Sequence, residues 1–187
     1  MTNHARFHNQ KLHSLVYATI VLEVDMRVGF WIFGCCLLVS PAQALDTKDI
    51  LGTWRLATAQ RTIVDTGEVV DSYGGPRPNG WINYDASGRV MVVVAYQGRE
   101  KPAGAAPTDA ERARLHRSFF AYAGTYTFDG KSITHAIDTS WNEAWTGTSQ
   151  VRDVAYADGK LVYTTRPAPF SGDGKVSVVT LVWERPN

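Results

Sequence analysis

The chain has 187 residues, of which 44% are hydrophobic and 20% are charged, and its 19 Lys and Arg nearly balance its 18 Asp and Glu. Because no run of basic residues occurs, neither nucleic acid nor an anionic membrane surface is expected as a partner. The charge balance and the aromatic content of 11% instead favour a globular protein with a substantial core.

Residues 1–44 have the pattern of an N-terminal extension followed by a secretory signal peptide. Met26 and one positive charge precede the apolar run VGFWIFGCCLLV, and a small-x-small site follows, which ends at Ala44. We therefore expect translation to start at Met26 and the mature chain to begin at Leu45, exported to the periplasm or the extracellular space without stable membrane insertion. An uncleaved anchor helix and lipidation of Cys35 are the two alternatives.

The expected mature chain, residues 45–187, has the size of one domain. Three basic and two acidic residues precede it, which leaves 16 of each sign and a net charge of zero. Cys35 and Cys36 both fall in the predicted signal, so neither a disulfide nor a thiolate metal site is expected in the domain. Only His116 and His135 remain there, so we expect no metal site and no cofactor.

Alternation of apolar and polar residues predicts that this domain consists mostly of β-strands. The segments that fit an extended conformation are 52–63, 68–73, 79–85, 88–96, 122–128, 131–140, 147–157, 160–166 and 176–185. Turn sequences such as DTG, DASG, DG and SGDG separate them. Such short connections imply antiparallel hairpins in sequence order, which predicts an all-β fold, either an up-and-down barrel or a sandwich.

One helix is expected to interrupt the strands. Thr108 and Glu111 fit a capping box at its start, and Leu115, Phe119 and Tyr122 then share one face of ERARLHRSFFAY. The flexible loop GREKPAGAAP precedes this segment. The helix is expected either to form a lid over one end of a barrel or to fill that end as part of the core.

The first and last strands carry residues that meet if the sheet closes on itself. Trp54 shares a face of the first strand with Leu56, and Arg185 shares a face of the last strand with Trp183. We expect the Arg185 guanidinium to lie across the Trp54 ring, a contact that contributes about 0.5–2 kcal/mol and seals the barrel floor.

Gly52-x-Trp54 on the first strand, with Arg185 on the last, resembles the signature of lipocalins and related calycins. Over essentially all of residues 45–187 the chain is similar to a bacterial and fungal lipocalin-like domain family, through the blocks LGTWRL, GWINYD, SGRVM, FFAYAGTYTFDG, ITHAIDTSWNEAW, GTSQVR and LVWER. The resemblance implies an antiparallel up-and-down barrel of about 8–10 strands with one inserted helix, in which Gly52, Trp54 and Arg185 are structural. The Thr-Asp-Tyr motif of classical secreted lipocalins is missing, so the partners of animal lipocalins are not implied.

The interior of such a barrel either fills with side chains or holds one small ligand. His135 lies on an apolar face of its strand and is expected to point inward, where a neutral core histidine bonded to a tyrosine is one interpretation and a ligand or catalytic role the other. Arg152 shares a face with Gln150, and on an inward face it needs an anionic partner. Asp138, Glu143 and a ligand carboxylate are the candidates; on an outward face Arg152 is solvated.

Aromatic residues near the expected open end complete the candidate site. The predicted ligand-binding residues are Tyr96, Tyr126, His135, Trp141, Trp145, Gln150 and Arg152.

The sequence favours binding of a small apolar or amphipathic molecule, with a carboxylate or carbonyl end among the options. The alternative from another class is a hydrolase, cyclase or isomerase with His135 as general acid/base, assisted by Asp138 or Glu143. Asp138, however, is out of alternation with His135, and neither a nucleophile elbow nor a Gly-rich phosphate loop is present. A haem barrel with His135 as axial ligand and a filled barrel with no ligand are the remaining alternatives.

Overall fold

The structure is a computed structural model that describes residues 45–186, so the predicted extension, signal peptide, cleavage site and both cysteines lie outside the described residues. The elements are α1 (Thr47–Ile50), β1 (Gly52–Ile63), β2 (Val69–Asp71), β3 (Asn79–Tyr84), β4 (Arg89–Ala95), α2 (Asp109–Arg117), β5 (Phe119–Phe128), β6 (Ser132–Ser140), the 3-10 turn η1 (Glu143–Trp145), β7 (Ser149–Ala157), β8 (Lys160–Thr165), β9 (Ala168–Pro169) and β10 (Val176–Glu184).

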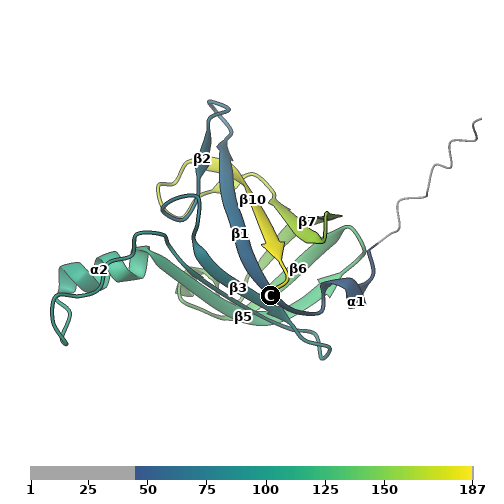
Figure 1. Cartoon of the computed structure of the whole chain (residues 1–187), viewed down its shortest axis with the longest axis horizontal. Helices are drawn as coiled ribbons and strands as arrows, with labels where there is room; N and C mark the ends of the chain where they lie inside the picture. Colours follow the sequence, from purple (N-terminus) through teal and green to yellow (C-terminus); the bar gives the residue numbers. More distant parts are fainter. Residues whose placement is uncertain (1–44, 187) are drawn as a thin grey trace, which may run out of the picture. The chain divides into compact units, whose positions relative to one another are not determined.

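The strands form one antiparallel sheet that closes into a barrel. Their order is β2-β1-β3-β4-β5-β6-β7-β8-β10-β9, and β1 also pairs with β10. This pairing extends from Arg55 opposite Glu184 to Ile63 opposite Ser177, and Figure 1 shows the two strands side by side. Eight strands therefore form an up-and-down barrel, and the short strands β2 and β9 are added at its edges.

The floor of the barrel is built around Trp54. Its ring is fully buried, its indole Nε1–H donates to the carbonyl of Ile50 at 2.8 Å, and the Arg185 guanidinium lies 3.7 Å above the ring centroid, as the sequence predicts. Arg185 also donates to the Leu51 carbonyl at 2.7 Å. Gly52 has φ +92°, and an added Cβ would lie 3.0 Å from Arg185 Nη1, so glycine is required at the start of the motif.

The core follows the alternation of each strand. On β10, Ser177, Val179, Leu181 and Trp183 point inward and are buried, whereas the residues between them are more exposed. Alternation of this kind is expected where one face of a sheet packs inside a barrel and the other meets water. The nine strands predicted from the sequence all overlap observed strands, and the structure adds β9.

The inserted helix is shorter than predicted and does not cover the barrel. Its capping box is present, since Glu111 N donates to Thr108 Oγ1 and Thr108 N donates to Glu111 Oε2. The helix ends at Arg117, so Phe119 and Tyr122 belong to β5 instead of the helical face. No residue of α2 is buried, and Figure 1 shows α2 projecting beyond β5. It is therefore not a core plug, and it contributes no lining residue to the cavity described below.

Within residues 45–186, no helix combines the length and the apolar character needed to cross a bilayer.

Candidate functional site

The barrel encloses a cavity of about 460 Å³. Inward side chains of β3, β4, β5, β7, β8 and β10 form its walls, and Tyr73 and the segment 165–171 lie at its edge. This volume is in the range of pockets that hold one small organic molecule. The interior is therefore not completely filled by side chains.

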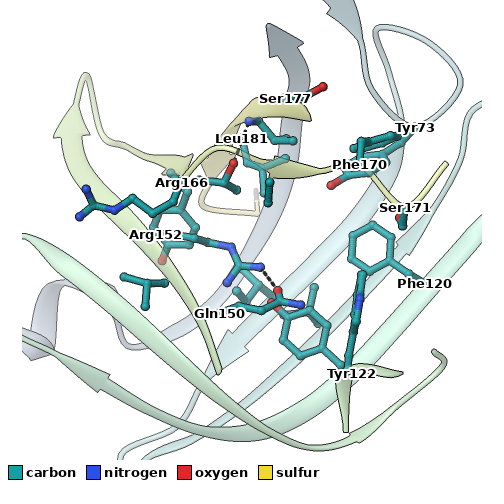
Figure 2. A pocket seen from close by; sticks show the side chains of 18 of the residues that line it. Tyr73, Phe120, Tyr122, Gln150, Arg152, Arg166, Phe170, Ser171, Ser177 and Leu181 are labelled. Atoms are coloured by element: carbon teal, nitrogen blue, oxygen red, sulfur yellow. Dashed lines mark hydrogen bonds between the residues drawn. The ribbon is translucent and has the colours of Figure 1, made fainter. Parts of the chain in front are cut away.

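Two charged side chains line this cavity, of which Arg166 is exposed and pairs with Asp153, and Arg152 is buried. Its side chain comes from β7 and points inward, and the residue is 8% exposed. Nη2 donates to Gln150 Oε1 at 2.5 Å, and the guanidinium carbon lies 5.9 Å from the Tyr122 ring centroid. Figure 2 shows Arg152 and Gln150 in the cavity wall, with Tyr122 close to them.

Arg152 forms no ion pair with any carboxylate of the described residues. Asp138, one of the predicted partners, is half exposed and pairs with Arg89. Glu143 instead accepts a hydrogen bond from Thr146 Oγ1 at 3.2 Å. Because an uncompensated charge is costly in a buried site, the cavity is suited to an anionic group supplied from outside the chain.

His135 contacts Arg152 and belongs to a buried hydrogen-bond network. The ring is 0% exposed, Tyr84 Oη lies 2.7 Å from Nε2, and Tyr122 Oη and Arg152 Nη1 lie 2.8 and 3.2 Å from Nδ1. A guanidinium only donates, so Nδ1 is the acceptor. We therefore assign the proton of the neutral ring to Nε2, which donates to Tyr84.

Both ring nitrogens of His135 are thus occupied by protein partners. The ring is also absent from the cavity wall. Neither nitrogen is free to exchange a proton with a bound molecule or to coordinate an iron, so this geometry does not support the acid/base and haem interpretations. Among residues 45–186, moreover, no three His, Cys, Asp or Glu side chains gather as a metal site would require.

The stability of the barrel is expected to depend on pH through His135. Burial, and next the positive charge of Arg152, hold the pKa of His135 well below its usual value of 6.5. The unfolded chain takes up a proton below about pH 6.5, whereas the folded chain stays neutral until its own lower pKa. The free energy of unfolding should therefore be constant just above about pH 6.5. It should fall as the pH drops below about 6.5, by at most about 1.4 kcal/mol per pH unit.

Urea unfolding between pH 7.5 and 5 measures this effect. The variant His135→Gln, which cannot titrate, is the control and should lose most of the slope. An equal slope in both proteins would show that other groups cause the dependence.

Aromatic rings surround the mouth of the cavity. The Tyr73 ring lies 5.1 Å from Phe120 and 6.1 Å from Phe170, and the Trp145 ring lies 6.1 Å from Phe120. Figure 2 shows Phe120, Phe170 and Tyr73 on one side of the cavity, opposite Arg152. These rings give the mouth an apolar surface for a ligand framework.

The segment that carries Phe170 is tied to β1 by Arg61. The Arg61 guanidinium lies 4.3 Å from the Phe170 ring centroid, and its Nη2 lies 2.6 Å from Asp173 Oδ2. The hydrogen bond from Arg61 lowers the pKa of Asp173 to about 2. This ion pair therefore persists throughout the physiological pH range and holds the edge of the cavity.

The structure brings three of the seven predicted site residues together. Trp145, Gln150 and Arg152 line the cavity, and His135 lies buried behind it. Tyr126 is in the core, where its hydroxyl donates to the Asp85 carbonyl at 2.9 Å. The other two lie elsewhere: Tyr96 borders a separate groove beside α2, and Trp141 borders a groove on the outer face of the sheet.

A bulge explains the position of Trp141. Ala123 pairs with Thr139 but Gly124 pairs with Ile137, so Asp138 is an extra residue on β6. An extra residue inverts the two faces of the strand beyond it, which turns Trp141 outward although it continues the inward alternation in the sequence. Gly124 is required at this point, because an added Cβ would lie 2.0 Å from the Ala136 carbonyl oxygen.

Sequence reasoning missed several lining residues. Tyr163 shares the inward face of β8 with Leu161 and is fully buried, so strand alternation could have identified it. Tyr73 and Phe170 follow short edge strands in irregular segments. No periodicity exists there to indicate where a side chain points.

A lipocalin-like domain model matches residues 51–186. The chain belongs to this lipocalin-like domain family. The match spans both strands that close the barrel, including Trp54 and Arg185. No curated protein matches the lipocalin-like chain significantly.

Solved structures that resemble the lipocalin-like barrel share little sequence with it. A lipocalin-like protein from Bacteroides uniformis is 13% identical, with 74% of this chain and 99% of that chain covered and a TM-score of 0.40. An uncharacterised protein from Bacteroides eggerthii is 16% identical, with 73% and 99% covered and a TM-score of 0.36. The N57A mutant of the fluorescent protein UnaG is 14% identical, with 76% and 99% covered and a TM-score of 0.36.

Proposed function

We propose that this barrel binds a small, mostly apolar molecule that carries one negatively charged group, and that Arg152 holds this group. The supporting observation is a buried guanidinium in the cavity wall without a carboxylate partner in residues 45–186. A guanidinium binds a carboxylate or sulfonate through two parallel, charge-assisted hydrogen bonds. The aromatic mouth supplies the apolar contacts for the remainder of the ligand.

Two fluorescent probes of matched shape test this function. One is 8-anilino-1-naphthalenesulfonate, and the other is N-phenyl-1-naphthylamine, which has the same rings without the sulfonate. We expect the anionic probe to bind at one site and the variant Arg152→Met to bind it roughly 10- to 100-fold more weakly, since a hydrogen bond to a charged group contributes about 1.5–3 kcal/mol. Affinity for the neutral probe should change little.

The control is structural, because partly unfolded proteins also bind the anionic probe. Near-UV circular dichroism and thermal melting of Arg152→Met must match those of the unaltered protein. If the variant is folded and binds both probes as before, Arg152 does not hold the anionic group.

The proposal also includes export, which is supported by the signal pattern of residues 26–44 alone. The N-terminal sequence of the protein isolated from its host tests it. Export with cleavage predicts Leu45 as the first residue, whereas an N-terminus at Met26 in the cytoplasmic fraction would contradict it.

A further inference from the structure

Two polar side chains of the cavity wall lack an acceptor for their proton. Tyr163 Oη and Trp183 Nε1 are buried, neither donates to any group of residues 45–186, and both residues line the cavity. The Tyr84 hydroxyl, which accepts from His135, is the donor beside Tyr163 Oη. The residues are 0% and 1% exposed. They are neighbours on β8 and β10, where their ring centroids lie 6.4 Å apart.

The other buried aromatic polar groups of the barrel interior show that this arrangement is exceptional. Trp54 donates to a backbone carbonyl, Tyr84 and Tyr122 bond to His135, and Tyr126 donates to the Asp85 carbonyl. Buried polar groups in proteins are nearly always partnered, and each exception requires an explanation. Four buried side-chain polar atoms of residues 45–186 lack a partner, and two of them, Ser72 Oγ and Trp141 Nε1, belong to residues outside the cavity wall. Tyr163 and Trp183 line the same cavity, so a bound molecule provides one explanation for these two.

The chemistry of the two groups defines the missing partner. The indole N–H only donates, and the phenol hydroxyl donates as well as accepts. One oxygen that accepts from both groups would satisfy them. That oxygen is expected to be uncharged, because Arg152 is the one charged residue among the buried residues of the described chain, and it is already assigned to the anionic group.

The strand register gives the order of the two binding points. Arg152 lies opposite Thr165, and Val154, the next inward residue of β7, lies opposite Tyr163. Trp183 lies opposite Leu161, a further inward position along β8. The acceptor site is therefore deeper in the barrel than the guanidinium, on the side away from the segment 166–171.

We propose that the ligand is an acid with a second, uncharged acceptor, such as the oxygen of a ketone or an ester, that accepts hydrogen bonds from Tyr163 Oη and Trp183 Nε1. This inference rests on the proposed function, because it assumes that Arg152 holds the acidic group. It narrows the ligand class from apolar acids in general to acids that carry an oxo or ester group within an apolar framework.

Matched ketone and methylene probes test the inference by calorimetry. The 2-, 3- and 4-benzoylbenzoates have a ketone between two rings at three distances from the carboxylate, and the corresponding benzylbenzoates have a CH₂ in its place. We expect at least one ketone to bind about fivefold or more tightly than its methylene analogue. Tyr163→Phe should reduce this preference, and Tyr163→Phe combined with Trp183→Phe should abolish it.

The control variant is Tyr126→Phe, which removes a hydroxyl that is bonded away from the cavity, and it should retain the preference. The inference is overturned if all three ketones bind no better than their methylene analogues, or if the preference is unchanged in Tyr163→Phe. Arg152→Met separates the two proposals. If it weakens ketone and methylene probes alike, the proposed function holds, whereas unchanged affinity for every probe contradicts that function itself.

A second measurement does not depend on any probe. Tyr163→Phe removes a hydroxyl whose own proton has no acceptor among residues 45–186, so the melting temperature of the ligand-free protein should fall less than in Tyr122→Phe. Tyr122→Phe removes a hydroxyl that is bonded to His135 at 2.8 Å. An equal decrease in both variants would show that the Tyr163 hydroxyl donates to a group within the protein, which contradicts the inference.

Discussion

Trp54→Ala is expected to lower the free energy of unfolding by about 3–5 kcal/mol, the usual cost of truncating a buried tryptophan. The indole is fully buried, bonds to the Ile50 carbonyl and lies beneath Arg185. The substitution removes all of these contacts and leaves a void where the first and last strands meet. Equilibrium unfolding in urea, followed by far-UV circular dichroism, measures the loss.

Trp81→Ala is the matched control for this prediction. Trp81 lies on the outer face of β3 and is 38% exposed, so its replacement should cost much less. If the two variants lose equal stability, the contacts around Trp54 in the barrel floor do not stabilise the fold more than a surface residue does. Where the protein is folded, Trp54→Ala should still bind the anionic probe, because Trp54 does not line the cavity.

His135→Ala is expected to cost about 2–4 kcal/mol of stability, for two reasons. It creates a void in the core, and it leaves the Tyr84 and Tyr122 hydroxyls without their partner. The guanidinium of Arg152 also loses the acceptor that helps to fix its position. We therefore expect a modest loss of affinity for the anionic probe, measured by titration, in addition to the loss of stability.

The second histidine of the described chain supplies the control. His116 is exposed at the end of α2, where its ring lies 4.4 Å from that of Trp141. His116→Ala should change stability by about 0.5 kcal/mol or less, as surface substitutions usually do. A His135→Ala variant as stable as His116→Ala would show that the buried hydrogen-bond network does not stabilise the barrel.

Much of the fold could be predicted because barrel strands alternate regularly. The contact between Trp54 and Arg185 follows from closure of the sheet and from the faces of β1 and β10. The inward direction of His135 follows from its apolar neighbours in the same way. These residues lie in regular strands, where a period of two fixes the side of the sheet.

The errors occur where this regularity is interrupted. Phe119 and Tyr122 fit a helical face together with Leu115, but the helix ends at Arg117 and β5 begins two residues later. The bulge at Asp138 turns Trp141 to the outer face. A single sequence shows neither the end of this helix nor the bulge, because both depend on pairing with distant strands.

The candidate site could be predicted only in part for a related reason. The sequence indicated that an inward Arg152 needs an anionic partner. Whether Arg152 points inward, and whether Asp138 is already paired with Arg89, depends on the tertiary structure. Among residues 45–186, the lack of an acceptor for Tyr163 Oη and Trp183 Nε1 likewise depends on every group that surrounds them.

A crystal structure of the protein with 8-anilino-1-naphthalenesulfonate tests whether Arg152 holds the charged group of a ligand in the barrel cavity. We predict that the rings occupy the barrel cavity and that the sulfonate oxygens lie within hydrogen-bonding distance of the Arg152 guanidinium. The competing location is the apolar groove on the outer face, which Trp81, Met91 and Trp141 border. A probe bound in that groove, with the cavity empty, would contradict ligand binding by Arg152 inside the barrel.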